Sequence, residues 1–328
     1  MSKGMDWTSR IGRRLKLRDL HILLTVVKSG SMGRAAQELA VSQPVVSKAI
    51  SDLEHALGVR LLDRGSQGVE PTKHGESLLR CGLAVFDELQ QGVKALEHLS
   101  DPTVGELRLG CTEPLAAGFV GAVIERLARD YPRVAFRVVT ADPLALKERE
   151  LERRNIELAI TPVEALVPAH EIDAELLFDD RQAIVAGANN PWTRRRRVEL
   201  SALMHEPWIL PPPDTIIGSE IAHAFHAAGF EPPRSQIESF SIPLCHRLLA
   251  TGRFIAMLPT SMVTLATYPP LKFLRLEPPM ISRPTGIITL RERTRSALAE
   301  TFIDAARKMA KPLACSTRAQ PLRQQQGP

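Results

Sequence analysis

The chain has 328 residues, of which 44% are hydrophobic, 24% charged and 5% aromatic. This is the composition of a soluble globular protein long enough for two or three domains. No apolar run approaches the roughly 18–20 residues that span a bilayer, and the basic N-terminus has no apolar stretch behind it. We therefore expect neither a membrane span nor a secretory signal.

The cysteines and the charges indicate where the chain works and what it binds. Its cysteines, Cys81, Cys111, Cys245 and Cys315, form no CxxC pair, which argues against a zinc site or a disulfide framework and favours a reducing cytoplasm. Residues 1–75 contain twelve Lys and Arg against seven Asp and Glu, so this segment alone carries the net charge of +5. A basic segment on a neutral body favours a polyanionic partner, although a solvated basic surface gives the same pattern.

Helical periodicity predicts two short helices near the N-terminus. Leucine and valine recur at spacings of three and four over residues 20–27, the stripe of an amphipathic helix, and Ser29-Gly30 interrupts it. Ser31 is placed to cap a second helix over residues 32–39, in which Ala35-Ala36 allows close packing of a neighbouring helix.

A third helix is predicted to follow a tight turn at Ala40-Val41. Ser42 caps it, Pro44 lies in its first turn, where a missing N–H does no harm, and Gly58 ends it. Two short helices joined by such a turn form a helix-turn-helix. The glycines of Gly65-Ser-Gln-Gly then permit a hairpin, and a hairpin in this place is the wing of a winged helix.

The remaining face of the third helix is small and polar: Gln43, Ser47, Lys48 and Ser51. A solvated face also explains polar residues, but such a face is usually rich in long Glu/Lys pairs, which the first two turns lack. Short polar side chains at the start of this helix suit the major groove of DNA, where they reach base edges without bulk. Arg34 and the wing residue Arg64 are expected to meet phosphates.

The segment from about Leu17 to Gly75 contains a dense, ungapped set of motifs. They lie in the run SGSMGRAAQELAVSQPVVSKAISDLEHALGVRLLDRGSQGVEPTKHG and include Ala35-Ala36, the Ser42-Gln-Pro turn, Leu53-Glu54 and the Leu-Gly-Val-x-Leu-Leu-x-Arg stretch ending at Arg64. This segment resembles the N-terminal domain of LysR-type transcriptional regulators.

The resemblance implies which residues read DNA. The positions that enter the major groove are then Gln43, Pro44, Ser47 and Lys48. Lys48 departs from the Arg that is commoner in the family, so it keeps the charge and loses bidentate reading of guanine. The full predicted DNA-binding set is Ser31, Arg34, Ser42, Gln43, Pro44, Ser47, Lys48, Ser51 and Arg64.

Residues 74–99 are predicted to form one linker helix. Apolar residues at 79, 86, 89, 93 and 96 fall on a heptad seam in which Gly82 is the only gap. The seam either packs on the C-terminal domain or pairs with a second copy, as the family's linker helix does. A dimer suits a DNA-binding protein, because two joined domains that bind two half-sites have a higher affinity than one domain alone.

The C-terminal region alternates strands and helices. Strands are predicted at 105–112, 134–140 and 158–161, with helices at 114–129 and 144–153, an order that implies a parallel sheet with covering helices. A second round begins near Leu176 and includes a helix over 219–228. Two such lobes resemble the periplasmic-binding-protein-like effector domain of the family, and residues 237–259 resemble its usual return into the second lobe.

Ligands of open α/β sheets bind beyond the carboxyl ends of strands, at helix N-termini. The polar residues in such places are Thr112, Glu113, Thr161, Thr215 and Ser219, and this is the predicted effector-binding set. Their alternative role is only to cap helices. Glu113 stands where small polar residues are commoner, and its charge disfavours an anionic effector unless a cation offsets it. The resemblance otherwise suggests aromatic, sugar-derived or other organic-acid effectors.

Other features are interpreted as structural. Arg194–Arg197 is expected to be a solvated loop, and His223 and His226 lie within reach of a metal but lack a third ligand nearby. An enzyme is disfavoured because G-x-S-x-G, Walker, G-x-G-x-x-G and HExxH motifs are missing. A free solute-binding protein would need an export signal and would not need a winged helix.

The predicted fold is therefore α/β overall, in four parts. These are a mainly α winged helix-turn-helix (1–73), a linker and dimerisation helix (74–101), a two-lobed α/β effector domain (102–311) and a disordered tail (312–328). The predicted function is a cytoplasmic, non-enzymatic transcription regulator that binds double-stranded DNA under the control of a small-molecule effector, without cofactor, metal or membrane. The resemblance adds a homodimer through the linker, a tetramer and contact with RNA polymerase.

Overall fold

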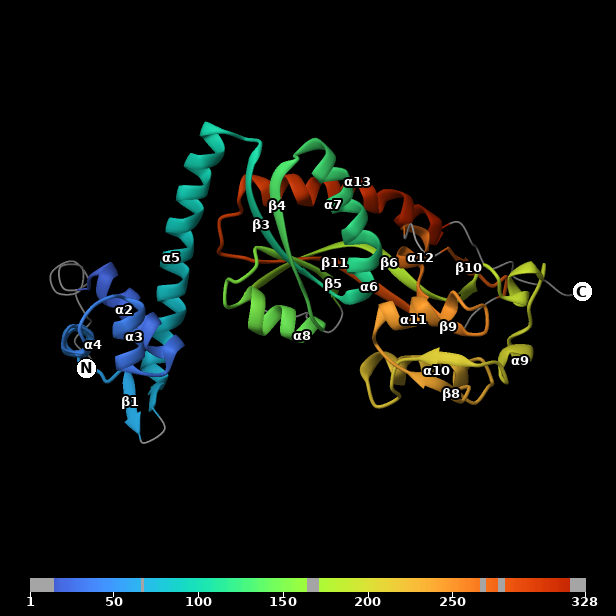
Figure 1. The fold of residues 1–328 in the computed structure, drawn as a ribbon, viewed down its shortest axis with the longest axis horizontal. Coiled ribbons are helices and arrows are strands. Elements are labelled where there is room, and N and C mark those ends of the chain that lie inside the picture. Colours follow the sequence, from blue (N-terminus) through green and yellow to red (C-terminus); the bar gives the residue numbers. More distant parts are fainter. Residues whose placement is uncertain (1–14, 66–67, 164–170, 266–269, 277–280, 319–328) are drawn as a thin grey trace, which may run out of the picture. The chain divides into compact units, whose positions relative to one another are not determined.

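The computed structural model describes residues 15–65, 68–163, 171–265, 270–276 and 281–318. The chain divides after Val93 into two compact units, drawn from blue through to red in Figure 1. Among the described helices, none has the length and apolar character to cross a bilayer.

The first unit is a three-helix domain with a wing. Helices α2 (Leu17–Ser29), α3 (Met32–Glu38) and α4 (Gln43–Leu57) enclose a core of fully buried side chains, and the hairpin of β1 (Leu62–Gly65) and β2 (Gly68–Pro71) follows. The predicted winged helix-turn-helix is thus present, with the predicted three-helix order.

The turn between α3 and α4 is closed by the backbone. Ala40 has φ 52°, in the left-handed region, and the Val41 N–H donates to the Ala36 carbonyl at 2.9 Å. A residue with left-handed backbone angles therefore follows the end of α3 and stops the helix. The predicted caps are wrong in one respect: Ser31 and Ser42 occupy N-cap positions, but neither hydroxyl bonds to its helix. At α4 the N–H groups of Val45 and Val46 donate to the Ser42 carbonyl instead.

Two side chains fix the wing to the helices. The Glu54 carboxylate of α4 accepts hydrogen bonds from the Leu61 and Leu62 N–H groups, at 2.7 and 3.3 Å. The Thr72 hydroxyl donates to the Arg60 carbonyl and accepts from the Gly75 N–H. The hairpin therefore leaves the helical core at a fixed place, directly after α4.

Helix α5 (Lys73–Ser100) has an apolar stripe that is used in two ways. Its first half covers the core of its own unit, where Leu79 and Phe86 pack, and Gly82 is a close approach rather than a gap, since a Cβ there would lie 3.1 Å from Leu20 Cδ1. Leu89, Val93 and Leu96 remain 51%, 55% and 67% exposed. The predicted single seam is therefore wrong for residues 79–86.

The second unit is built on one mixed nine-stranded sheet. Its strands are β3 (Val104–Cys111), β4 (Arg133–Thr140), β5 (Leu158–Pro162), β6 (Ile172–Gly187), β7 (Trp208–Leu210), β8 (Ser235–Glu238), β9 (Ile255–Pro259), β10 (Leu271–Phe273) and β11 (Ser282–Leu290). The order is β4-β3-β5-β11-β6-β9-β7-β8, with β10 beside β6. Strands β3, β4 and β5 run parallel in one lobe, and β7, β8 and β9 do so in the other. Strands β6 and β11 are antiparallel partners, and β6 continues past β11 to pair with β9 of the second lobe.

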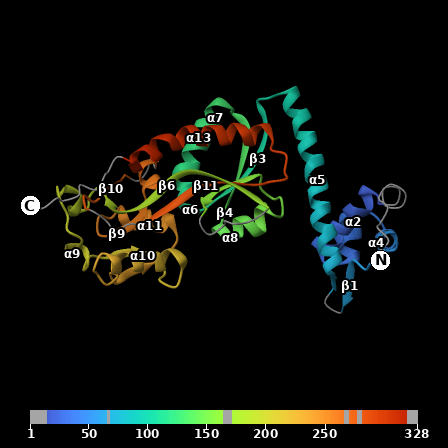
Figure 2. The same ribbon diagram turned by 180° about the vertical axis from the view of Figure 1, so that it is seen from behind.

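Helices cover the sheet in each lobe. The first lobe carries the continuous stretch α6 (Glu113–Leu115), η2 (Ala116–Val120) and α7 (Gly121–Asp130), and the shorter α8 (Pro143–Ala145) and η3 (Leu146–Leu151). The second carries η5 (Pro191–Arg194), α9 (Leu200–Leu203), α10 (Ile216–Ala227), α11 (Ile242–Leu249) and α12 (Thr260–Leu265). Figures 1 and 2 show α13 (Ala297–Arg318) returning along the first lobe, beside α7.

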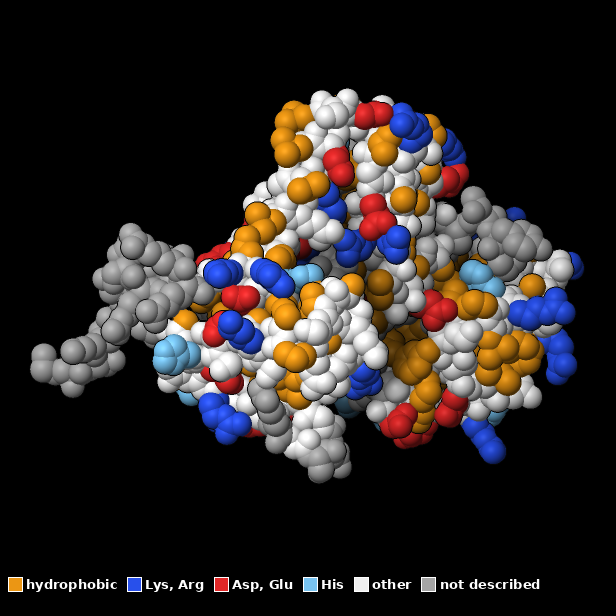
Figure 3. Space-filling model, turned by 60° about the vertical axis from the view of Figure 1, so that its left-hand side comes forward, with side chains coloured by type: hydrophobic (Ala, Val, Ile, Leu, Met, Phe, Trp, Pro, Cys, Tyr) orange, Lys and Arg blue, Asp and Glu red, His pale blue; other side chains and the backbone are white. Residues whose placement is uncertain are grey.

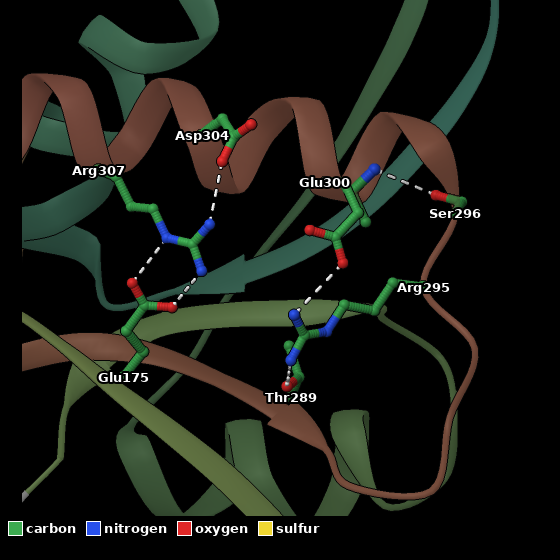
Figure 4. Close-up of polar contacts among 8 residues, drawn as sticks. Glu175, Thr289, Arg295, Ser296, Glu300, Asp304 and Arg307 are labelled. Atoms are coloured by element: carbon green, nitrogen blue, oxygen red, sulfur yellow. Dashed lines mark hydrogen bonds and ion pairs between the residues drawn. The ribbon is translucent and has the colours of Figure 1, made fainter.

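Helix α13 extends past the predicted start of the disordered tail at residue 312. It continues through Pro312 to Arg318 because Leu313 and Ala314 still pack on the core of the first lobe. Figure 4 shows the polar contacts on its exposed side, where Arg307 donates two hydrogen bonds of 2.7 Å to Glu175 of β6 and a third to Asp304. The remainder of the predicted tail, 319–328, lies outside the described residues.

Two glycines of helix α5 give opposite predictions for stability. A Cβ at Gly75 would lie 2.1 Å from the Leu61 carbonyl oxygen, whereas nothing lies within 4 Å of a Cβ at Gly92. We expect Gly75→Ala to cost about 1–3 kcal/mol through overpacking and Gly92→Ala to stabilise the helix by up to about 1 kcal/mol. Calorimetric unfolding of both variants measures this, and a stable Gly75→Ala protein would contradict the packing described.

The Arg307–Glu175 pair predicts a pH-dependent stability. Hydrogen bonds from Arg307 hold the pKa of Glu175 below its usual value, so the pair stabilises the fold above the unfolded-state pKa of about 4.3, and this is lost as the pH falls further. Because both side chains are nearly half exposed, Arg307→Met should cost about 1 kcal/mol or less at pH 7.

The free energy of unfolding of the Arg307→Met variant and the unchanged chain, followed from pH 7 to below pH 4, should converge at the acid end. Arg129→Met, which breaks only an exposed ion pair within α7, is the control and should have a smaller effect at pH 7. A difference that is constant with pH would mean that Arg307 acts through packing alone.

Candidate nucleic-acid interface and effector site

The N-terminal face of α4 belongs to a helix that is packed firmly on the core. Val46, Ala49, Ile50 and Leu53 are buried and fix the helix on the core. On the other side Gln43, Lys48 and Ser51 are exposed and Ser47 is half-buried. The side chains of Gln43, Ser47 and Lys48 form no hydrogen bond or ion pair with any residue that the structure describes, so their polar groups are available to a partner.

The other predicted DNA-binding residues surround this face. Gly33 lies in the first turn of α3, and a Cβ there would be 3.8 Å from Ser31 Oγ and 4.0 Å from Gln43 Oε1, so both side chains border this glycine. Arg34, Ser42 and Pro44 are exposed nearby in the sequence. Arg64 pairs with Val69 in the wing, and its side chain lies outside the described residues.

On the face that Figure 3 views, charge does not mark out a separate patch. Figure 3 shows acidic and basic side chains interspersed on the face that it views, rather than gathered by sign. The α4 face is distinguished by a rigid helix start with short, free polar groups, which is the arrangement that a major-groove reader needs. Glu54, which holds the wing, was not among the predicted functional residues; it lies seven and eight positions before Leu61 and Leu62, from whose N–H groups it accepts hydrogen bonds.

Three of the predicted effector residues meet at one edge of the sheet. Strands β3 and β5 are parallel neighbours with Cys111 opposite Ile160, so Thr112 and Thr161 follow at adjacent strand ends. Thr161 is fully buried and its hydroxyl lies 3.5 Å from the Pro162 carbonyl, a distance too long for a good hydrogen bond. Thr112 is half-buried at the N-cap of α6, where its hydroxyl makes no capping bond.

Glu113 reaches from this edge to the second lobe. Its Oε1 accepts a hydrogen bond of 3.3 Å from the Ile242 N–H, at the start of α11. The N-cap of α11 is Ser241, which the predicted effector set did not include. The signal for it was a serine two positions before Pro243, the pattern of a helix start.

The other two predicted effector residues lie at the start of α10. The Thr215 hydroxyl accepts from the Gly218 N–H and donates to the Pro212 carbonyl, so Thr215 caps this helix. Ser219 is exposed one turn later. Neither residue has a described contact with Thr112, Glu113 or Thr161, so their part in an effector site stays a prediction.

A buried carboxylate that sequence analysis did not single out lies on β6. Asp180 accepts hydrogen bonds from the Ser261 N–H and hydroxyl and from Thr260, at the start of α12. Burial raises its pKa, while these hydrogen bonds act in the opposite direction. Helix α12 in turn lies against η2, where a Cβ at Gly118 would be 2.5 Å from the Met262 Cα.

The remaining candidates are separate from these sites. Arg194–Arg197 are exposed, as expected of a solvated loop, and Arg197 lines a hollow of about 630 Å³ together with Arg275, Phe230 and Leu276. His226 pairs with Glu231 at 3.1 Å. Within the described ranges, no three His, Cys, Asp or Glu side chains are grouped to hold a metal ion.

Burial raises the pKa of the Cys111 and Cys245 thiols to about 12, which makes both unreactive.

Comparison with known proteins identifies both halves. Residues 17–76 match the bacterial regulatory helix-turn-helix of the lysR family, and residues 100–311 match the LysR substrate binding domain. The chain belongs to the LysR family of transcriptional regulators. It is 30% identical over 306 residues to the HTH-type transcriptional regulator GbpR of Azospirillum brasilense, covering 90% of this chain and 86% of that protein. It is 27% identical over 312 residues to the uncharacterized regulator YdcI of Escherichia coli K12, covering 93% and 99%.

Solved LysR-family structures share the fold. A full-length OxyR variant from Pseudomonas aeruginosa superposes with a TM-score of 0.64 at 22% identity, covering 94% of this chain and 99% of that one. CbnR in complex with its target DNA gives a TM-score of 0.60 at 19% identity, covering 90% and 100%. This LysR-type protein is thus a transcription regulator, not an enzyme, with a DNA-binding helix-turn-helix and an effector-binding domain.

Proposed function

We propose that this LysR-type regulator reads its operator with the free face of α4. Gln43 and Ser47 contact base edges in the major groove, Lys48 enters the groove with its charge on a phosphate, and Pro44 allows close approach at the helix start. The observation that carries the proposal is that these polar side chains project from a rigidly packed helix without partners in the described structure. Polar groups in this state lose only water on binding and need no rearrangement of the core.

The surrounding residues position the domain on the duplex. Ser31, Ser42 and Ser51 present hydroxyls and Arg34 a guanidinium beside the reading face, where they contact phosphates. Arg64 does the same from the wing. Such contacts fix the register of α4 but carry no sequence information, so their loss weakens binding to all DNA alike.

We further propose that the regulator works as a homodimer through α5. The exposed side chains of Leu89, Val93 and Leu96 form half of a heptad seam that the chain itself leaves exposed. A second copy of the same helix covers this surface, and two linked domains then read two half-sites. A tetramer, and contact with RNA polymerase at the promoter, complete the proposed assembly.

The proposed control is a population shift in the effector domain. A small molecule bound near Thr112, Glu113 and Thr161, with Thr215 and Ser219 on the opposite lobe, has different contacts in different arrangements of the lobes. It therefore favours one arrangement. The assembly then changes the spacing of bound half-sites. The chain uses no cofactor or metal in this scheme and acts in the cytoplasm.

The reading face is tested by the triple substitution Gln43→Ala, Ser47→Ala and Lys48→Ala. Because a good base contact is worth about 1–3 kcal/mol, affinity for the operator should fall about 30-fold or more and approach that for random DNA. Gel shifts on the gene's own upstream DNA measure this, with His55→Ala at the other end of α4 as the control. Undiminished affinity and selectivity in the folded triple variant would overturn the proposal.

A salt titration of the single variant Lys48→Ala tests its charge. Its plot of log affinity against log salt should be shallower by about 0.9 per lost phosphate contact, whereas Lys272→Ala, in the effector domain, should keep the full slope. An unchanged slope for Lys48→Ala would remove this residue from the interface.

The dimer is tested by the triple substitution of Leu89, Val93 and Leu96 by Gln, which preserves helix propensity and removes the apolar surface. Sedimentation should show loss of the α5 dimer, with mass falling toward the 36.2 kDa of one chain. Ala95→Gln, on another face of the same helix, is the control. A triple variant with an unchanged sedimentation mass would show that copies associate elsewhere.

A further inference from the structure

The starts of two helices from different lobes meet at Glu113. This residue is in the first turn of the continuous helical stretch 113–130, and its carboxylate accepts the Ile242 N–H at the start of α11. Helix starts carry partial positive charge, so a carboxylate is favourable in both places. No Lys or Arg forms an ion pair with Glu113 in the described part of the chain, which leaves these helix ends to balance its charge.

The first turn of α11 has no N–H left over for an external anion. The Ser241 N–H donates to Ser239 Oγ at 3.0 Å, the Ile242 N–H to Glu113, and the Leu244 N–H to Ser241 Oγ at 3.4 Å. Pro243 has no N–H to offer. The protein thus satisfies with its own groups the donors through which a helix start would bind a ligand's carboxylate or phosphate.

The side chains of Thr112 and Glu113, in contrast, still have oxygen atoms that can accept hydrogen bonds. Glu113 Oε2 accepts no hydrogen bond from a described residue, and the neighbouring Thr112 hydroxyl makes no capping bond. Both residues are half-buried. The start of α11 therefore has no free N–H for an anion, and Glu113 offers a negatively charged acceptor to a molecule that brings hydroxyl or ammonium donors.

We propose that Glu113 is a resident anion that sets the chemical class of the effector: an uncharged or cationic molecule rich in hydrogen-bond donors, not a carboxylate or phosphate. This inference rests on the proposed effector site between the lobes. An anionic ligand placed there would meet the Glu113 charge at short range and find the α11 donors taken. A donor-bearing ligand would bind Oε2 while the bond to Ile242 is kept.

Acetate is the probe that tests this, because it reproduces the carboxylate of Glu113 as a free molecule. In the full-length Glu113→Ala variant, acetate at about 0.2 M should raise the melting temperature by about 2 °C over sodium chloride of equal ionic strength. The unchanged chain should not respond, because its own carboxylate occupies the position. Methylammonium chloride, the cationic counterpart, should stabilise the unchanged chain more than Glu113→Ala.

Two further variants separate this effect from general salt stabilisation. Glu113→Gln retains an acceptor oxygen and the side-chain volume, so it should keep the fold and not respond to acetate. Glu148→Ala, which removes an exposed carboxylate from the same lobe, should behave like the unchanged chain. Equal acetate responses in the unchanged chain and Glu113→Ala, or no response in either, would overturn the proposal. DNA binding is not part of this readout, so a failed gel shift would count against the proposed function and not against the role of Glu113.

Discussion

The pairing of β6 with β11 is the constraint on which the effector domain depends. The two strands are hydrogen-bonded neighbours from Ser282 opposite Arg181 to Leu290 opposite Ile172. On one side β11 pairs with β5 of the first lobe, and on the other β6 pairs with β9 of the second. The lobes are therefore halves of one sheet, and the proposed change in their relative angle would have to bend this pair.

The register of that pair shifts between Thr285 and Gly286, and the elements around the shift connect the lobes. Asp180 on β6 holds the start of α12 by three hydrogen bonds, and α12 packs without space against Gly118 of η2. Since η2 continues the helix that begins at Glu113, a displaced α11 or α12 moves against the same helical stretch. In the proposed effector site, a ligand that alters the Glu113 contact would thus act on a packed element rather than on a free loop.

Local sequence patterns correctly predicted the features of the fold that depend on residues close together in the chain. The α4 boundaries follow from Pro44 and Gly58, the exposed polar face of α4 from its short polar residues, and the βαβαβ order from alternating periodicity. Partners distant in sequence were not predictable. The Glu113–Ile242 bond joins residues 129 positions apart, the long strands β6 and β11 join both lobes, and α13 continues past Pro312 only because the first lobe offers a core for Leu313.

The apolar stripe of α5 shows why periodicity alone leaves the partner open. Residues 79, 82 and 86 have the same spacing as 89, 93 and 96, yet the former pack on α2 of their own unit, where Gly82 admits Leu20, and the latter stay exposed. Because a helix is stiff along its length, the packed half fixes the direction in which the exposed half leaves the winged domain. In the proposed dimer, pairing along the α5 seam then sets the distance between the two α4 helices. This distance in turn sets the spacing of the two half-sites that the dimer binds.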